Sequence, residues 1–120
     1  MNLLIVEDSE RMRRMLKSVV KGIPAEVYEC SDGSEALAAY THHHPDWVFM
    51  DIEMKDVDGI TATRQIMTDF PDARVVIVSN HDSDDLRAAA THAGACAYIV
   101  KENLLEVRRL LSACKSTNSS

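Results

Sequence analysis

The chain has 120 residues, of which 46% are hydrophobic and 27% charged, a balance typical of one globular domain with a single core. Its formal net charge of −6 would repel a phosphate backbone, so we expect no direct binding of nucleic acid by this domain. The sequence shows neither an apolar run of membrane-spanning length nor a leader-like start, so we expect a cytoplasmic protein that does not bind a membrane.

Five short apolar runs along the chain predict β-strands. The first, third and fourth are nearly continuous, as expected of strands buried on both faces of a parallel sheet. The second alternates between apolar and polar residues and therefore predicts an edge strand. The predicted strands span 3–6, 25–28, 47–50, 74–78 and 97–100.

Helical patterns lie between and after these runs, because apolar residues recur there with the spacing of one buried helix face. The predicted helices span 12–20, 34–43, 60–70, 86–93 and 104–114. Five strand–helix repeats with short links predict an α/β fold, a doubly wound five-stranded parallel sheet with right-handed crossovers. We expect residues 1–114 to form this domain and residues 115–120 to be a polar tail or the start of a linker.

Polar side chains follow four of the apolar runs. Glu7 and Asp8 follow the first run, Asp51 the third, Ser79 the fourth and Lys101 the fifth. Any one of these residues alone has an ordinary explanation as a helix cap, a turn former or a surface charge. The carboxyl ends of parallel strands, however, lie at one edge of the sheet, where ligands bind in this class of fold. We therefore expect the five side chains to form one site.

The chemistry of these side chains points to phosphoryl transfer. In the flavodoxin-like strand order 2-1-3-4-5, the first and third strands are neighbours, and three carboxylates converge. Carboxylates that lie close together repel one another unless a cation neutralises them, and a site made only of oxygen ligands suits Mg²⁺. Lys101 adds an ammonium group and Ser79 a hydroxyl donor for phosphoryl oxygens, while Asp51 supplies an oxygen nucleophile.

These residues and their neighbours resemble the receiver domain of two-component response regulators. Val48-Phe-Met-Asp-Ile-Glu-Met-Lys-Asp-Val-Asp-Gly59 resembles the phosphorylation-site signature of that family. Asp32-Gly-Ser-Glu-Ala-Leu37 resembles the start of its second helix, and Gly94-Ala-Cys-Ala-Tyr-Ile-Val-Lys101 its fifth-strand signature. The likeness covers about the first 114 residues.

The resemblance implies that Asp51 accepts a phosphoryl group from a sensor histidine kinase or a phosphotransfer protein. Such a domain is not an enzyme in the usual sense, although it phosphorylates itself from small donors and slowly loses the phosphoryl group. Asp8, the Asp51 carboxylate and the backbone carbonyl of Glu53 would bind Mg²⁺, with Glu7 assisting through water.

The resemblance also implies how the signal leaves the site. Ser79 and Lys101 would hold phosphoryl oxygens, and Tyr98 would be the switch aromatic whose rotamer follows Ser79. The fourth helix, fifth strand and fifth helix would then present the output surface, which an output domain, a partner protein or a second copy of the chain would contact.

Two residues beside the acceptor depart from the family pattern. Lys55 stands where the family usually has proline, so this loop loses a rigid φ angle and gains a positive charge. Asn80 replaces the small residue that often follows the switch hydroxyl, which would restrict access to the phosphoryl group. We expect both changes to tune the rates of phosphoryl gain and loss and to leave the acceptor in place.

Three other functions fit parts of the sequence. An aspartate-nucleophile phosphatase is suggested by Asp51-Ile-Glu53, but that nucleophile is expected after the first strand and the chain has no room for a cap domain. In an FMN carrier, the charges of Glu7 and Asp8 would repel the cofactor phosphate. A degenerate receiver that works without phosphate is disfavoured by the intact acceptor set.

Overall fold

The computed structural model describes the backbone of residues 1–119 and the side chains of residues 1–112. Its strands are β1 (Asn2–Val6), β2 (Glu26–Cys30), β3 (Trp47–Met50), β4 (Val75–Ser79) and β5 (Ala97–Val100). They form one parallel sheet in the order β2-β1-β3-β4-β5, so the predicted flavodoxin-like arrangement is confirmed. The alternating run β2 is an edge strand, as its pattern predicts.

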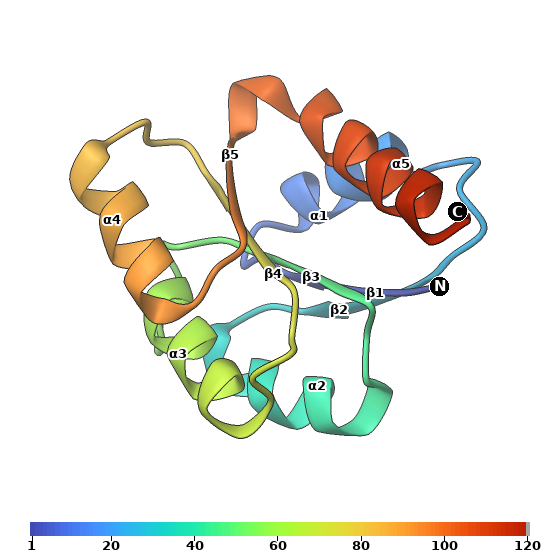
Figure 1. Ribbon diagram of the computed structural model, residues 1–120. Helices are drawn as coiled ribbons and strands as arrows, with labels where there is room; N and C mark the ends of the chain where they lie inside the picture. Colours follow the sequence, from blue (N-terminus) through green and yellow to red (C-terminus); the bar gives the residue numbers. More distant parts are fainter. Residues whose placement is uncertain (120) are drawn as a thin grey trace.

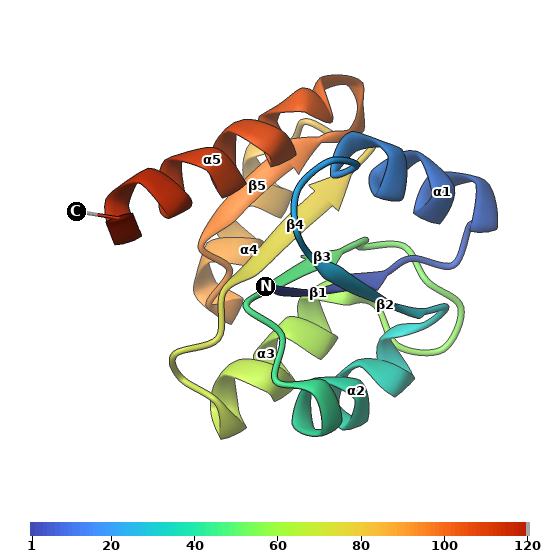
Figure 2. The same cartoon turned by 90° about the vertical axis from the view of Figure 1, so that its right-hand side faces the viewer.

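The helices lie in two layers, one on each face of the sheet (Figures 1 and 2). One layer contains α1 (Glu10–Val19) and α5 (Leu105–Ser119). The other contains α2 (Ala36–His43), α3 (Gly59–Asp69) and α4 (Asp84–Ala93). Short 3₁₀ turns, η1 (Gly33–Glu35) and η2 (Lys101–Asn103), precede α2 and α5.

The core consists of two apolar clusters, because successive side chains of a strand point to opposite faces of the sheet. In β1, Leu4 and Val6 belong to the cluster under α2, α3 and α4, whereas Leu3 and Ile5 belong to the cluster under α1 and α5. All four side chains are at most 1% exposed. Burial on both faces explains why β1, β3 and β4 are continuous apolar runs in the sequence.

Serine and aspartate side chains fix where the helices beside the site begin. Ser9, Asp58 and Ser83 are the N-caps of α1, α3 and α4, and each accepts a hydrogen bond from a backbone N–H of the first helical turn. Because each cap stands at the carboxyl edge of the sheet, these helices all start near the strand ends and lead away from them.

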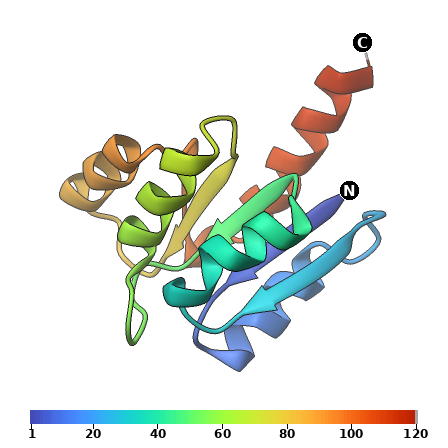
Figure 3. The same cartoon turned by 90° about the horizontal axis from the view of Figure 1, so that it is seen from below.

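The helix α5 continues to Ser119, past the predicted end of the domain at residue 114. The reason is local, since no glycine or proline follows Cys114 to end the helix. The last turns of α5 extend beyond the sheet in Figure 3. Ser120 and the side chains after residue 112 lie outside the described part, so the domain boundary at 114 stays a prediction. In the described residues, no helix combines the length and apolar character needed to cross a membrane.

Candidate functional site

The carboxyl ends of four strands open into one cavity of about 410 Å³. Its lining includes all the side chains that the sequence places after the strands, namely Glu7, Asp8, Asp51, Ser79 and Lys101. Ser79 differs slightly from its expected place, because it is the last residue of β4 and does not follow it. The predicted site is therefore one physical cavity.

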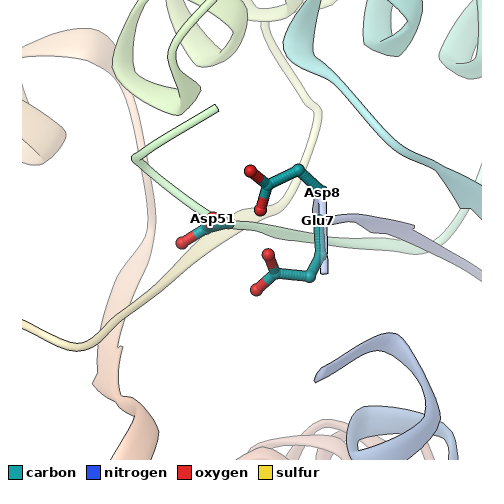
Figure 4. Close-up of side chains that lie close together, drawn as sticks. All are labelled: Glu7, Asp8 and Asp51. Carbon is teal, nitrogen blue, oxygen red and sulfur yellow. The ribbon is translucent and has the colours of Figure 1, made fainter. Parts of the chain in front are cut away.

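Three carboxylates face the same space in this cavity (Figure 4). Glu7 and Asp8 follow β1 and Asp51 follows β3, and the pairing of Val6 with Met50 makes these two strand ends neighbours. One oxygen from each carboxylate lies within 4.8 Å of the others. Glu7 is 2% and Asp51 7% exposed, whereas Asp8 is exposed to solvent. Such a set of oxygen atoms fits a hard cation such as Mg²⁺.

The close approach of these carboxylates affects their protonation. The pKa of Asp8 is raised above its ordinary value, chiefly by a hydrogen bond with Glu7, and further by partial burial and by the Glu7 charge. The ionised form of Asp8 is therefore disfavoured in the folded protein without a cation. This electrostatic strain is what a bound divalent cation would relieve.

Lys101 supplies a positive charge inside the cavity. Its Nζ lies 2.7 Å from Oε1 of Glu7 and 3.1 Å from Oδ1 of Asp51, and the lysine side chain is only 9% exposed. Burial lowers the pKa of Lys101, but the contacts with Glu7 and Asp51 outweigh this effect and leave the pKa above its ordinary value. Lys101 is therefore charged at neutral pH.

His81, which sequence reasoning missed, connects Ser79 to Tyr98. The backbone N–H of His81 donates to Oγ of Ser79 at 3.1 Å, and its carbonyl accepts from the Tyr98 hydroxyl at 2.6 Å. Its ring Nε2 lies 2.6 Å from Oε1 of Glu53, across the mouth of the cavity. The half-buried Tyr98 ring also stacks under the guanidinium group of Arg87, at 4.7 Å from its centroid. The only signal in the sequence was the position of His81 two residues after Ser79.

Asp32 is a second residue whose role sequence reasoning missed. Its buried carboxylate accepts hydrogen bonds from the backbone N–H groups of Asp56, Val57 and Ser34, at 2.9, 3.1 and 2.8 Å. These bonds, first among them the one from Asp56, lower its pKa below the ordinary value. Asp32 thus fixes the loop that follows Asp51. The capping box that it forms with Glu35 is visible in the sequence as Asp-x-x-Glu, but the bonds to Asp56 and Val57 are not.

Gly59 allows α3 to begin directly against the backbone of Asp51. A Cβ atom at this position would lie 1.8 Å from the Asp51 carbonyl oxygen, so no other residue fits without a shift of the backbone. The Gly59 N–H also donates to the carbonyl of Ile52 at 2.8 Å. The two ends of the loop between β3 and α3 are therefore held together by the close contact of Gly59 with Asp51 and Ile52.

Comparison with known proteins gives the same family from sequence and from structure. The family model of the response regulator receiver domain matches residues 3–115. The chain is 37% identical over 116 residues to the chemotaxis protein CheY of Bacillus subtilis, covering 96% of this chain and 95% of that protein. The solved response regulator domain of Thermotoga maritima CheB has a TM-score of 0.83 and 31% identity, covering 97% of this chain and 94% of that one.

A further solved structure, the complex of CheX and CheY with BeF₃ and Mg²⁺ from Borrelia burgdorferi, is similar with a TM-score of 0.82 and 32% identity. That match covers 93% of this chain and 87% of the matched chain. The family match includes every residue that lines the cavity, from Glu7 to Lys101.

Proposed function

Because this chain belongs to the response regulator receiver domain family, we propose that Asp51 is the residue that accepts the phosphoryl group in two-component signalling. Membership makes the chain a phosphoacceptor module and not a classical enzyme. The single observation that supports Asp51 is the contact of its carboxylate with Lys101 in a cavity that Glu7 and Asp8 also line.

In the proposed transfer, an oxygen of Asp51 forms a bond to the phosphorus atom of the donor. The bond between phosphorus and the leaving group breaks, and the leaving group departs with the electron pair. Little covalent chemistry is required of the protein, so positioning and charge stabilisation account for the acceleration. Lys101 and the hydroxyl of Ser79 would hold phosphoryl oxygens, and both already line the cavity.

Mg²⁺ is the proposed cofactor, and it would neutralise charge between the carboxylates and the phosphoryl group. Asp8, Asp51 and the backbone carbonyl of Glu53 would hold the ion, with Glu7 acting through water. The clustering of the three carboxylates supports this assignment. So does the presence of Mg²⁺ in the Borrelia CheY complex.

The output would begin with Ser79. If its Oγ turns to a phosphoryl oxygen, it no longer accepts from His81, and the loop that carries the carbonyl partner of Tyr98 is released. Tyr98 would then change rotamer on the surface formed by α4, β5 and α5. We propose that an output domain, a partner protein or a second copy of the chain binds this surface. We also propose that a sensor histidine kinase or a phosphotransfer protein phosphorylates Asp51 in the cytoplasm.

Phosphorylation from a small donor tests the assignment. The protein is incubated with acetyl phosphate and Mg²⁺, and the added phosphoryl mass is measured on the intact chain. Wild type should be labelled and Asp51→Asn should not. Asp56→Asn, which removes an exposed carboxylate from the same loop, should be labelled like wild type. Equal labelling of wild type and Asp51→Asn would refute the assignment, and no labelling of wild type would favour a receiver that works without phosphate. The slow loss of label after removal of the donor measures autodephosphorylation.

A further inference from the structure

The cavity has a second lysine, Lys55, whose ammonium group has no partner among the described residues. Lys55 lies in the loop between β3 and α3 and lines the cavity together with Lys101. Its side chain is exposed, and among the described residues it takes part in no ion pair or side-chain hydrogen bond. Lys101, by contrast, is engaged by Glu7 and Asp51. The nearby carboxylate of Glu53 is also occupied, by His81.

The backbone on both sides of Lys55 is fixed, so the lysine is held at the cavity. The two residues after it, Asp56 and Val57, donate their N–H groups to the carboxylate of Asp32. The residue before it, Met54, packs against the core cluster under α3. The exposed Lys55 side chain extends from this backbone, and its long stem allows the ammonium group to follow a ligand.

The balance of charged groups in the cavity indicates a role for the Lys55 ammonium group. Four carboxylates line the cavity, those of Glu7, Asp8, Asp51 and Glu53, against the two ammonium groups of Lys55 and Lys101. Without Lys55, these four carboxylates would face a single ammonium group, that of Lys101, besides the proposed Mg²⁺. A phosphodonor is itself an anion. Such a cavity would repel it, because the low-dielectric walls of a cleft focus the electric field of the carboxylates.

We propose that Lys55 binds the incoming phosphodonor, by pairing its ammonium group with an oxygen of a doubly charged phosphoryl compound such as an acyl phosphate. This inference rests on the proposed function of Asp51 and adds a donor preference to it. In the transfer, an Asp51 oxygen bonds to phosphorus, the bond from phosphorus to the acyl oxygen breaks, and the carboxylate product leaves with the electron pair.

The experiment compares two small donors of different charge. Acetyl phosphate is a dianion at neutral pH, whereas phosphoramidate carries less negative charge. Initial rates of Asp51 labelling are measured with both donors, at low and high ionic strength and at Mg²⁺ concentrations that saturate each variant. The variants are Lys55→Gln, Lys55→Arg and the control Lys21→Gln, which removes an exposed ammonium group from the turn that follows α1.

At low salt, Lys55→Gln should lower the rate with acetyl phosphate roughly fivefold and the rate with phosphoramidate by no more than about twofold. The difference should disappear at high salt, because salt screens exposed charges. Lys55→Arg, which keeps the positive charge, should lower the rate with acetyl phosphate less than Lys55→Gln does, whereas Lys21→Gln should keep the rates of wild type. Binding is also measured without phosphoryl transfer: inorganic phosphate is titrated into the protein, and its affinity is obtained from the NMR chemical shifts of the loop amides. Its affinity should fall by a similar factor in Lys55→Gln only.

An unchanged ratio of the two donor rates in Lys55→Gln, or an equal effect of Lys21→Gln, would overturn the role of Lys55. Neither result would contradict the proposed role of Asp51, provided that wild type is labelled and Asp51→Asn is not. Labelling of Asp51→Asn would instead overturn the proposed function itself. Because Lys55 is exposed, its substitution should leave the thermal unfolding midpoint unchanged, which excludes misfolding as a cause.

Discussion

Glu7 follows β1 and Lys101 follows β5, the first and last strands in chain order, and their side chains form an ion pair of 2.7 Å. Glu7 is buried and Lys101 is partly buried, with side-chain exposures of 2% and 9%, and the same ammonium group contacts Asp51. The sequence allows Lys101 to be either an ordinary surface charge or a member of the site. The contact with Glu7 favours the second interpretation, because an ordinary surface lysine would extend into solvent. The lysine holds two buried carboxylates together in the protein without metal.

Replacement of Lys101 by methionine should therefore destabilise the metal-free protein. Glu7 and Asp51 would remain buried without a cation, at a cost of about 2 kcal/mol, less than for a fully enclosed pair because the cavity opens to solvent. Urea unfolding in EDTA measures the change. Lys21→Met, at an exposed site, should shift stability by less than about 0.5 kcal/mol. A Lys101→Met protein as stable as wild type would show that water already screens the two carboxylates.

Mg²⁺ should stabilise wild type, and Asp8→Asn should remove most of this effect. Because the pKa of Asp8 is raised in the fold, its charge opposes folding at neutral pH when no cation is bound. Asp8→Asn should thus stabilise the metal-free protein by up to about 1 kcal/mol. Thermal unfolding with EDTA and with increasing Mg²⁺ measures both changes, since a ligand that binds only the folded state raises its stability. Asp56→Asn should respond to Mg²⁺ like wild type, and a full response of Asp8→Asn would argue against the metal assignment.

Gly59→Ala should disturb the acceptor although Gly59 has no functional group. Its Cβ would meet the Asp51 carbonyl oxygen at 1.8 Å, so either α3 or the end of β3 must move. We expect a loss of about 2 kcal/mol in unfolding free energy, as for other overpacked sites, and slower labelling of Asp51. The exposed Gln65→Ala on the same helix is the control and should change stability by less than about 0.5 kcal/mol. Normal stability and normal labelling of Gly59→Ala together would contradict the close approach.

Asp32 should make the stability of the protein depend on acidic pH. Its folded pKa is lowered, so the stability that it contributes is present above the unfolded value of about 3.9 and is lost as the pH falls through the folded pKa. Asp32→Ala should therefore be less stable than wild type at neutral pH, and the gap should narrow below about pH 4. Asp32→Asn keeps one acceptor oxygen but cannot titrate, so it should lose less stability at neutral pH and show the same narrowing. Urea unfolding over this pH range is the measurement, and a gap that stays constant would contradict the role of Asp32.

The path from Ser79 to Tyr98 shows which part of the site the sequence could not predict. Resemblance to the family marks both residues, and the structure places them two contacts apart, joined through His81. Nothing in the periodicity around His81 indicates this, because its contacts use backbone atoms in a loop. The same holds for the bonds from Asp56 and Val57 to Asp32, which join loops far apart in the chain.

The strands, the helices and the residues that follow each strand can be predicted from local sequence patterns. Strand and helix periods are local properties, and a run such as β3 must be buried on both faces, so Asp51 has to emerge at its carboxyl end. The distances within the cavity follow from the three-dimensional fold. They determine which carboxylates Lys101 reaches and how closely Gly59 approaches Asp51. They also place Lys55 at the cavity with no ion-pair partner among the described residues. Those contacts depend on strand register and loop paths, which are set by packing between segments distant in sequence.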